Sequence, residues 1–559
     1  MSRQHQKLTW LLIVIVGFLT VCPVVMLISG SFSKGLTASG DFTLTKYFEA
    51  YTDPDLFGVL FNTAVFVPGA ALLAVVLALF LAYISVRTNM PFRFLFKIIP
   101  VIPMMIPHIL FSISWVMLLN PSNGILNLLL KQFFNLETSP FNIYTLPGMI
   151  MVEGLLDMPI AYLIIAPAMA SFDVALEESS RVCGAGSSRT LWRITLPVLR
   201  PAILAAFILC IIRCLASFAV PSAIGMRGRI YVLATHLYRM ISTGFSADYG
   251  KAAAVGVAVL VSSVILIYVY RYFTSASEKF VTISGRGYKP SVVELKKAKI
   301  PVFIVLVILS FVLIILPVLV LVYISLVPYS MVPSAKAFGM MTLKNWNIVF
   351  HDKLSLTSLK NSLFLGVTGA SLGIVLSVFV AYVIVKVKTK ASGLLETLSF
   401  LSFSFPGIVI GVGFMWFFVR TPLYATLWAL LIGYIATYLP YGIRPLSSAF
   451  IQIHNHLEES SQVAGASWFT TLRRIILPLL VPGMVSGWIL MATMFLRELT
   501  LSVVLSRPGS EVLAVQILRF SEDGQWGRLS ALGIIMIAIS IVLVALVNMI
   551  GGKIRPAEL

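Results

Sequence analysis

The chain has 559 residues, of which 59% are hydrophobic and 11% charged, with a formal net charge of +19 and a mean hydropathy of +0.97. A soluble domain has roughly 25% charged residues, so this composition excludes a soluble globular protein. No basic patch is interleaved with aromatic residues in a soluble domain, so we expect no nucleic-acid partner. Alternating segments of about 10 residues, typical of membrane barrels, are also absent. The composition therefore predicts an all-α polytopic membrane protein.

Apolar runs of about 20 residues or more recur from end to end, and each can span a bilayer as a helix. The first, residues 9–32, follows Arg3 and Lys7 and is too long for the core of a cleaved signal peptide, so we expect an uncleaved first span. We predict about twelve spans in all. They lie at residues 9–32, 58–86, 95–118, 143–171, 199–222, 251–273, 300–327, 359–385, 395–419, 423–447, 480–503 and 529–550.

A polar tract follows the fourth predicted span and recurs, at a fixed offset, after the tenth. The first copy contains Glu178, Ser179, Ser180, Gly184, Ile194, Leu196 and Pro197. The second contains Glu459, Ser460, Ser461, Gly465, Ile475, Leu477 and Pro478. A tract this polar is costly in lipid, so both copies should lie in water or against a partner protein.

The repeat divides the chain into a first half at 1–273, a linker at 274–299 and a second half at 300–559. Six spans is an even number, so both halves should have the same orientation, related by a pseudo-two-fold axis along the membrane normal. The first half holds extra residues between its third and fourth spans, which we assign to 120–140. This insertion contains an amphipathic run, Ile125–Phe134.

Lysine and arginine indicate which side of the membrane the loops face. With the N-terminus inside, the inner segments hold more Lys and Arg than the outer segments. The positive-inside rule counts these residues in short loops. We therefore expect the N- and C-termini and both polar loops, 172–198 and 448–479, in the cytoplasm.

Both tracts resemble the cytoplasmic loop signature of ABC importer permeases, E-A-A-x3-G-x9-I-x-L-P, with Ser-Ser in place of Ala-Ala. The resemblance implies a fused, two-half permease of the type I importer (MetI-like) fold in the bacterial cytoplasmic (inner) membrane. It implies that each loop docks on one of two ATP-binding subunits. Glu178 and Glu459 would then meet basic side chains, and Gly184 and Gly465 would form the turns. An extracytoplasmic substrate-binding protein and membrane lipid are the other implied partners.

The chain does not contain its own ATPase motif. A phosphate loop requires G-x4-G-K-[ST], and the Gly-Lys pairs at 250–251 and 552–553 both lack this pattern. No nucleophile–base constellation is apparent either, so we expect a non-enzymatic permease without cofactors, powered by a separate subunit. Cys210 and Cys214 lie four apart without His or carboxylate neighbours in sequence, so no metal site is expected.

Three stretches, at 120–127, 218–225 and 497–499, resemble the ferric-iron permease group. Ferric iron is therefore the expected substrate, with phosphonate, thiamine and polyamine as alternatives. A gradient-driven secondary carrier is the rival class. Such a carrier, however, has no need for two matched docking loops.

Charged residues inside predicted spans are costly and are functional candidates by default. They are Glu153, Asp157, Arg213, Arg497 and Glu498. These side chains either line the translocation path or form satisfied pairs between helices. A proton-coupled carrier would use them as relays.

Overall fold

The computed structural model describes residues 3–33, 42–92, 96–97, 99–171, 175–242, 247–277 and 294–552. Within these ranges the regular structure is almost entirely helical, and an isolated bridge joins Ser33 to Phe42. Most of the expected linker, 278–293, lies outside the described residues.

The helices of the first half are α1 (Arg3–Ser31), α2 (Thr45–Tyr51), α3 (Pro54–Arg87), η1 (Ile99–Met105), α5 (His108–Leu119), α6 (Ile125–Phe134), α7 (Leu146–Ala170), α8 (Ala175–Val182), α9 (Ser187–Thr190), η2 (Leu191–Thr195), α10 (Leu196–Ala216), η3 (Pro221–Gly225), α11 (Leu233–Ser242) and α12 (Tyr249–Ser277). Those that follow are η6 (Lys296–Ala298), α13 (Lys299–Ser310), η7 (Phe311–Ile315), α14 (Leu316–Leu326), α15 (Ala335–Gly339), α16 (Lys344–His351), α17 (Lys353–Phe364), η8 (Leu365–Gly369), α18 (Ala370–Tyr382), η9 (Val383–Val387), α19 (Lys390–Leu401), η10 (Ser402–Ser404), α20 (Gly407–Phe418), α21 (Leu427–Gln452), α22 (Asn455–Val463), α23 (Trp468–Thr471), η11 (Leu472–Ile476), α24 (Leu477–Leu496), α25 (Thr500–Leu505), α26 (Leu513–Glu522) and α27 (Trp526–Gly552).

Nine helices among the described residues are long and apolar enough to cross a membrane. They coincide with nine of the predicted spans. Their bounds are His5–Ser31, Pro54–Arg87, Leu146–Ala170, Leu191–Ala216, Tyr249–Phe273, Lys299–Leu326, Lys353–Val387, Trp468–Leu496 and Trp526–Leu543. The predicted all-α polytopic class is confirmed.

The third and ninth predicted spans are interrupted at equivalent prolines. Pro107 precedes α5 with ψ 133°, and Pro406 precedes α20 with ψ 136°. Proline removes a backbone donor and drives the residue before it out of the helical region, so each span ends in a half-helix of 12 residues. The tenth span, α21, is continuous but contains Arg444 and two prolines.

Each half packs its first span against the other half. The first helix, α1, contacts α19 and α20 of the second half, while α14 contacts α5 of the first. Two glycines allow the first contact. A Cβ on Gly30 would lie 2.5 Å from the Trp416 ring, and one on Gly413 would collide with the carbonyl oxygen of Pro23. The two halves therefore interlock.

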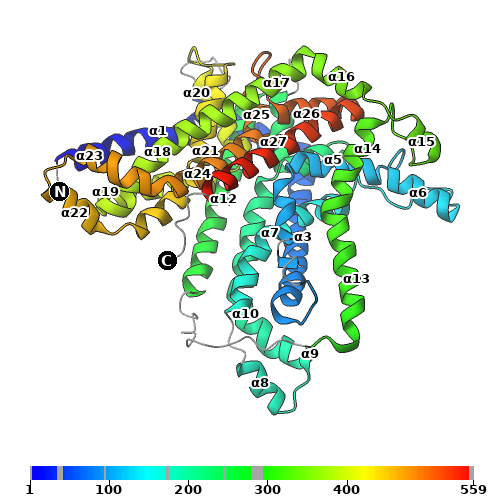
Figure 1. Cartoon of the computed structure of the whole chain (residues 1–559). Helices are drawn as coiled ribbons and strands as arrows, with labels where there is room; N and C mark the ends of the chain where they lie inside the picture. Colours follow the sequence, from blue (N-terminus) through cyan, green and yellow to red (C-terminus); the bar gives the residue numbers. More distant parts are fainter. Residues whose placement is uncertain are drawn as a thin grey trace.

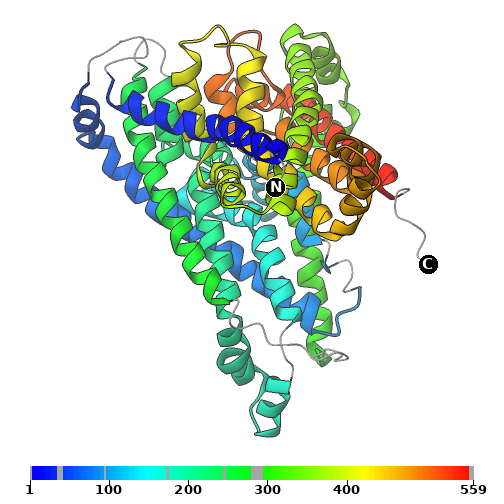
Figure 2. The same ribbon diagram turned by 90° about the vertical axis from the view of Figure 1, so that its left-hand side faces the viewer.

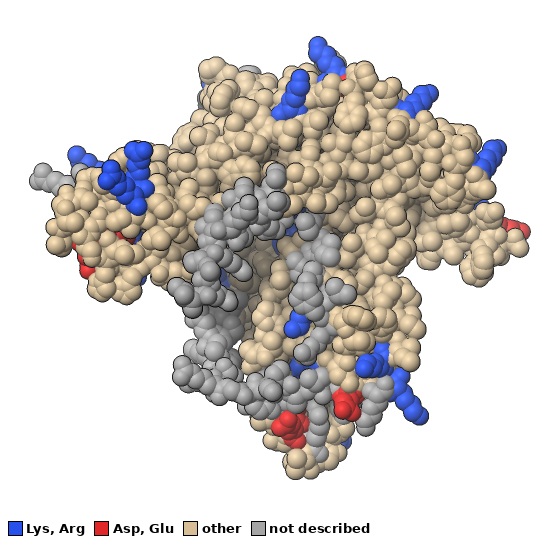
Figure 3. All heavy atoms as spheres, in the orientation of Figure 1, with Lys and Arg blue, Asp and Glu red and all other residues tan. Residues whose placement is uncertain are grey.

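The two polar loops fold as short helical hairpins. Figure 1 shows α8–α9 at the bottom and α22–α23 at the left, while α6, α15 and α16 lie toward the upper right. Figure 2 again places α8–α9 at the lower tip. In Figure 3 the described part of the central surface is mostly uncharged, and charged side chains lie mainly at the left, top, right and bottom margins. A broad surface with few charged residues is expected of a membrane-spanning protein.

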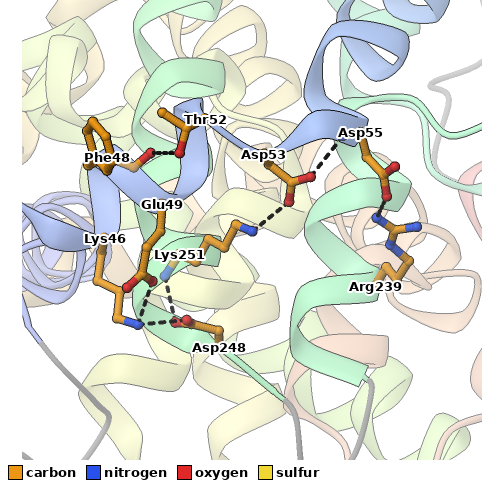
Figure 4. A network of polar contacts seen from close by, with 9 residues as sticks. All are labelled: Lys46, Phe48, Glu49, Thr52, Asp53, Asp55, Arg239, Asp248 and Lys251. Carbon is orange, nitrogen blue, oxygen red and sulfur yellow. Dashed lines mark hydrogen bonds and ion pairs between the residues drawn. The ribbon is translucent and has the colours of Figure 1, made fainter.

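An ion-pair network joins α2, α3, α11 and α12 at the other end of the first half (Figure 4). Lys46 Nζ lies 2.7 Å from Asp248, Lys251 Nζ 2.5 Å from Asp53, and Arg239 2.5 Å from Asp55. Burial alone would raise the pKa of the Asp53 carboxyl, but the Lys251 hydrogen bond and charge hold that pKa below its usual value. The network ties the N-termini of α3 and α12 together.

The interlock predicts that Gly413→Ala will destabilise the protein. The new methyl group meets the backbone of α1, and overpacking of this kind costs about 1–3 kcal/mol. Gly393→Ala is the matched control, because a Cβ there meets nothing within 4 Å. Thermal unfolding of the purified protein in detergent should show a lower Tm for Gly413→Ala alone; equal Tm values would contradict the interlock.

Candidate functional site

The first hairpin turns at Gly184, which follows the end of α8. Gly184 has φ +80°, in the left-handed region that side chains other than glycine rarely adopt. The Ala185 amide donates to the Ser180 carbonyl at 3.0 Å. The Ser180 hydroxyl lies 3.0 Å from the Thr190 hydroxyl and so links the two arms of the hairpin.

The second hairpin repeats this geometry. Gly465 has φ +81°, the Ala466 amide donates to the Ser461 carbonyl at 3.0 Å, and the hydroxyls of Ser461 and Thr471 are 2.8 Å apart. A Cβ on either glycine would meet nothing within 4 Å. The turn therefore requires glycine for its backbone dihedral and not for space.

The I-x-L-P part of each tract lies where the second arm enters a membrane span. A π-helical turn at Leu191–Thr195 and another at Leu472–Ile476 connect the arms to α10 and α24. Pro197 and Pro478 occupy the first turn of those helices. A proline ring presses on the carbonyl four residues earlier, which here belongs to the π turn. Widening the helix at that point relieves the clash and keeps arm and span continuous.

A buried ion pair anchors the first hairpin to the membrane bundle. Arg87, in the last turn of α3, lies 2.9 Å from Glu177, and their side chains are 1% and 5% exposed. The Thr195 hydroxyl donates to the same carboxylate at 2.7 Å. Glu177 thus connects α3, α8 and the π turn.

The second half has the equivalent pair, in a looser form. Lys386 lies 3.7 Å from Glu458, with side chains 7% and 14% exposed. The Lys386 ammonium also donates to the Ile453 carbonyl at 2.6 Å and to Asn455 Oδ1 at 2.7 Å. Sequence reasoning missed all four ion-pair residues. A signal was present, because each tract has two adjacent glutamates and each second span ends in a base at an equivalent position.

The predicted coupling carboxylates point outward instead. Glu178 and Glu459 are exposed, and Glu459 lies 2.9 Å from the His456 ring nitrogen. Val182 and Val463, at the ends of α8 and α22, are 88% and 90% exposed. Of the remaining predicted loop residues, Ser461 is buried. The others are exposed or partly buried, namely Ser179, Ser180, Ile194, Leu196, Pro197, Ser460, Ile475, Leu477 and Pro478.

Three of the predicted path residues come together between α7 and α10. Arg213 Nε donates to Asp157 at 2.9 Å, and the Ser217 hydroxyl donates to Glu153 at 2.7 Å. The Cys214 thiol donates to Asp157 at 3.2 Å. Ligand atoms of Glu153, Asp157 and Cys214 lie within 4.8 Å of one another, an arrangement that sequence spacing did not reveal. Each of these three side chains already has a hydrogen-bond partner within the chain.

Arg497 and Glu498 form a separate group at the breaks in the third and ninth spans. Arg497 donates to the Met104 carbonyl at 2.6 Å, across the boundary between the halves. Glu498 accepts from the Thr500 hydroxyl and the Leu501 amide, each at 2.7 Å, and from Tyr438. The structure therefore gives every predicted path residue a polar partner.

A hollow of about 320 Å³ lies between the halves, beside α11 and α12 of the first and α25 and α26 of the second. Its polar lining includes Tyr238, Arg507, Arg519 and Glu522. Since α12 begins at the ion-pair network of Figure 4, this hollow is at the end of the molecule opposite the α8–α9 hairpin.

Comparisons with known proteins follow the repeat. Residues 74–278 and 373–556 each match the family described as binding-protein-dependent transport system inner membrane component. The ferric transport system permease protein FbpB of Actinobacillus pleuropneumoniae is 27% identical over 97% of this chain and 78% of its own length. The Fe(3+)-transport system permease protein FbpB 2 of Haemophilus influenzae is 23% identical, covering 97% of both chains. The spermidine/putrescine permease PotC of Haemophilus influenzae is 27% identical over 37% of this chain and 82% of its own.

The anchoring pairs predict different costs for adjacent glutamates. Glu177→Ala removes the carboxylate that faces buried Arg87, and breaking a buried ion pair costs about 3–5 kcal/mol. Glu178→Ala, on the exposed side, should leave the Tm unchanged. Glu458→Ala should have an intermediate effect, because Lys386 keeps two other acceptors.

The measurement is thermal unfolding of the three variants in detergent. Joint replacement, Arg87→Met with Glu177→Leu, should recover most of the lost stability, since the buried charges disappear together. Equal losses for Glu177→Ala and Glu178→Ala would show that the ion pair does not anchor the hairpin.

Proposed function

Since the chain belongs to the family of binding-protein-dependent transport system inner membrane components, and is thus the permease of an ABC importer, we propose that it couples two ATP-binding subunits to the import of ferric iron. The ATP-binding subunits would dock on the cytoplasmic hairpins, α8–α9 and α22–α23. A substrate-binding protein would dock at the end of the molecule opposite the α8–α9 hairpin, where the hollow lies.

The paired hairpins carry this proposal. Two segments far apart in sequence have the same glycine turn, the same hydroxyl–hydroxyl contact and the same π turn. Each presents an exposed glutamate and an exposed valine at the end of a short helix. Two matched surfaces, one per half, suit two copies of the same partner.

The anchoring makes each hairpin a rigid part of its half. A force applied to α8 reaches α3 through the Glu177–Arg87 pair and reaches α10 through the continuous helix beyond the π turn. ATP-driven closure of the two subunits would therefore draw the hairpins together and rock the halves. The path would then open toward the binding protein, and hydrolysis would reset the inward-open state.

The path itself would run between the halves, past the broken third and ninth spans. Discontinuous helices in equivalent positions are a pointer to the translocation site in transporters with internal repeats. Arg497 and Glu498 lie at these breaks, and the Glu153–Asp157–Arg213 group lies on α7 and α10. The satisfied pairs support a structural role for these charges, with Arg213, 32% exposed, as the member most open to the path.

Ferric iron is favoured as cargo because the ferric permeases match this chain through both halves, over 97% of its length. Polyamine is the second candidate, because PotC matches over 37% of the chain, the extent of one half. Uptake of each candidate cargo in radioactive form by the complete transporter distinguishes the two. Inhibition of uptake by unlabelled ferric citrate supports iron as the cargo, whereas inhibition by spermidine alone would identify polyamine as the cargo instead.

The coupling role predicts a graded loss of transport. A charge-assisted hydrogen bond contributes about 1.5–3 kcal/mol, and partial exposure lowers that. Glu178→Ala or Glu459→Ala alone should therefore leave partial uptake, while the double variant should lose nearly all uptake and most of the co-purifying ATPase. Glu137→Ala, an exposed acid in the insertion, is the control. Normal co-purification and uptake in the double variant would exclude these carboxylates as coupling contacts.

A second prediction separates an importer from a gradient-driven carrier. The chain reconstituted alone in liposomes should neither hydrolyse ATP nor concentrate substrate, because the chain contains no phosphate loop. Addition of the ATP-binding subunit and the binding protein should restore both activities. Uptake driven by a proton or ion gradient in the lone chain would overturn the proposal.

A further inference from the structure

The insertion in the first half forms a helix, α6, between α5 and α7. The equivalent connection in the second half, between Phe418 and Leu427, has no helix in its described residues. Since the repeat does not require α6, this helix belongs to no symmetric part of the transport path. Among its contacts with other helices, that with α5 is the main one.

A buried asparagine fixes how α6 is oriented. The Asn127 amide donates to the carbonyls of Leu119, Asn120 and Phe141 at 2.8–3.0 Å, and its oxygen accepts from the Phe141 amide at 3.1 Å. Ser139 adds a hydrogen bond to the Pro121 carbonyl at 2.5 Å. The start and the end of the insertion are thus clamped to one another through α6. These hydrogen bonds therefore fix which face of α6 points away from the protein.

That outward face is apolar. Phe133 and Phe134 are 80% and 61% exposed, and Leu129, Leu136 and Phe141 are also exposed. Within 125–141 the charged residues are Lys131 and Glu137. In Figure 3 the right-hand projection, where α6 lies in Figure 1, is mostly uncharged. Exposed aromatic side chains on a rigidly held helix indicate a surface that something covers.

We propose that α6 lies in the outer lipid–water interface, with Phe133 and Phe134 among the acyl chains. The connection between α5 and α7 places α6 where two spans leave the bilayer, and the helix projects from the edge of the molecule, as Figure 1 shows. An amphipathic helix whose apolar face carries Phe and Leu lies at that depth. The hollow between the halves, at the end where the binding protein is proposed to dock, is lined by residues of α11, α12, α25, α26 and the 506–508 loop and by none from α6.

Spin labelling tests the depth of this face. Single cysteines at Phe133 and at Lys131 are introduced into a chain in which Cys22 and Cys183, the free cysteines that are not buried, are serine. Lys131 is partly buried and lies about 160° around the helix from Phe133. The labelled full chain is reconstituted in phosphatidylglycerol–phosphatidylethanolamine vesicles, and collision rates with oxygen and with a water-soluble nickel chelate are measured.

The ratio of oxygen to nickel collisions should be several-fold higher at Phe133 than at Lys131, because oxygen concentrates in the acyl region. Adding Asn127→Ala should reduce that difference, since the clamp then no longer sets which face meets the lipid. Equal ratios at the two sites would place α6 in water and overturn the proposal. A ratio that rises at Phe133 only with the binding protein added would assign the face to that protein. A ratio that falls on dilution to one chain per vesicle would assign the face to a second copy.

Discussion

The buried contact between Arg87 and Glu177 is the interaction on which the coupling geometry depends. The hairpin that begins at Ala175 has few residues and an exposed outer surface, so it has no core of its own. Its position is set by one carboxylate that reaches into the bundle and meets a base and a hydroxyl there. The Lys386–Glu458 contact repeats this arrangement at a longer distance and with more exposure. The second hairpin is therefore held less tightly by its ion pair, and backbone and amide acceptors share its lysine.

Apolar length, repeat spacing and glycine placement are local properties, so the sequence alone predicts the helical class, nine of the spans and both hairpin turns. Which of Glu177 and Glu178 is buried cannot be predicted from such local properties. The two residues have the same side chain and lie about 100° apart on one helix, so only tertiary packing decides which is buried. The breaks at Pro107 and Pro406 were hidden for a related reason. The flanking residues are apolar throughout, and hydropathy does not report where a helix stops.

Each half has a hydroxyl–carboxylate contact in this region, but the two contacts join different positions of the repeat, because Glu153 corresponds to Tyr434 and not to Tyr438. The Ser217 hydroxyl donates to Glu153 in the first half, whereas the Tyr438 hydroxyl donates to Glu498 in the second. Ser217 and Glu498 occupy equivalent positions in the repeat, as do Asp157 and Tyr438. The acid of the first contact, Glu153, lies on the fourth span, whereas the acid of the second, Glu498, follows the end of α24. The sequence repeat is therefore two-fold, while the polar contacts inside each half are not.

The crossing of α1 onto α20 has a consequence for biogenesis. Ser31 ends the first helix, and Gly407 begins its partner. At about 5–20 residues per second, the ribosome needs roughly 20–75 s to synthesise the chain between them. During that interval the face of α1 that includes Gly30 has lipid or insertion machinery as its neighbour. An aromatic ring replaces that neighbour only when Trp416 arrives. Nascent chains halted before residue 407 should thus hold a first helix that is inserted and can pack on α12, but whose Gly30 face still lacks its aromatic neighbour.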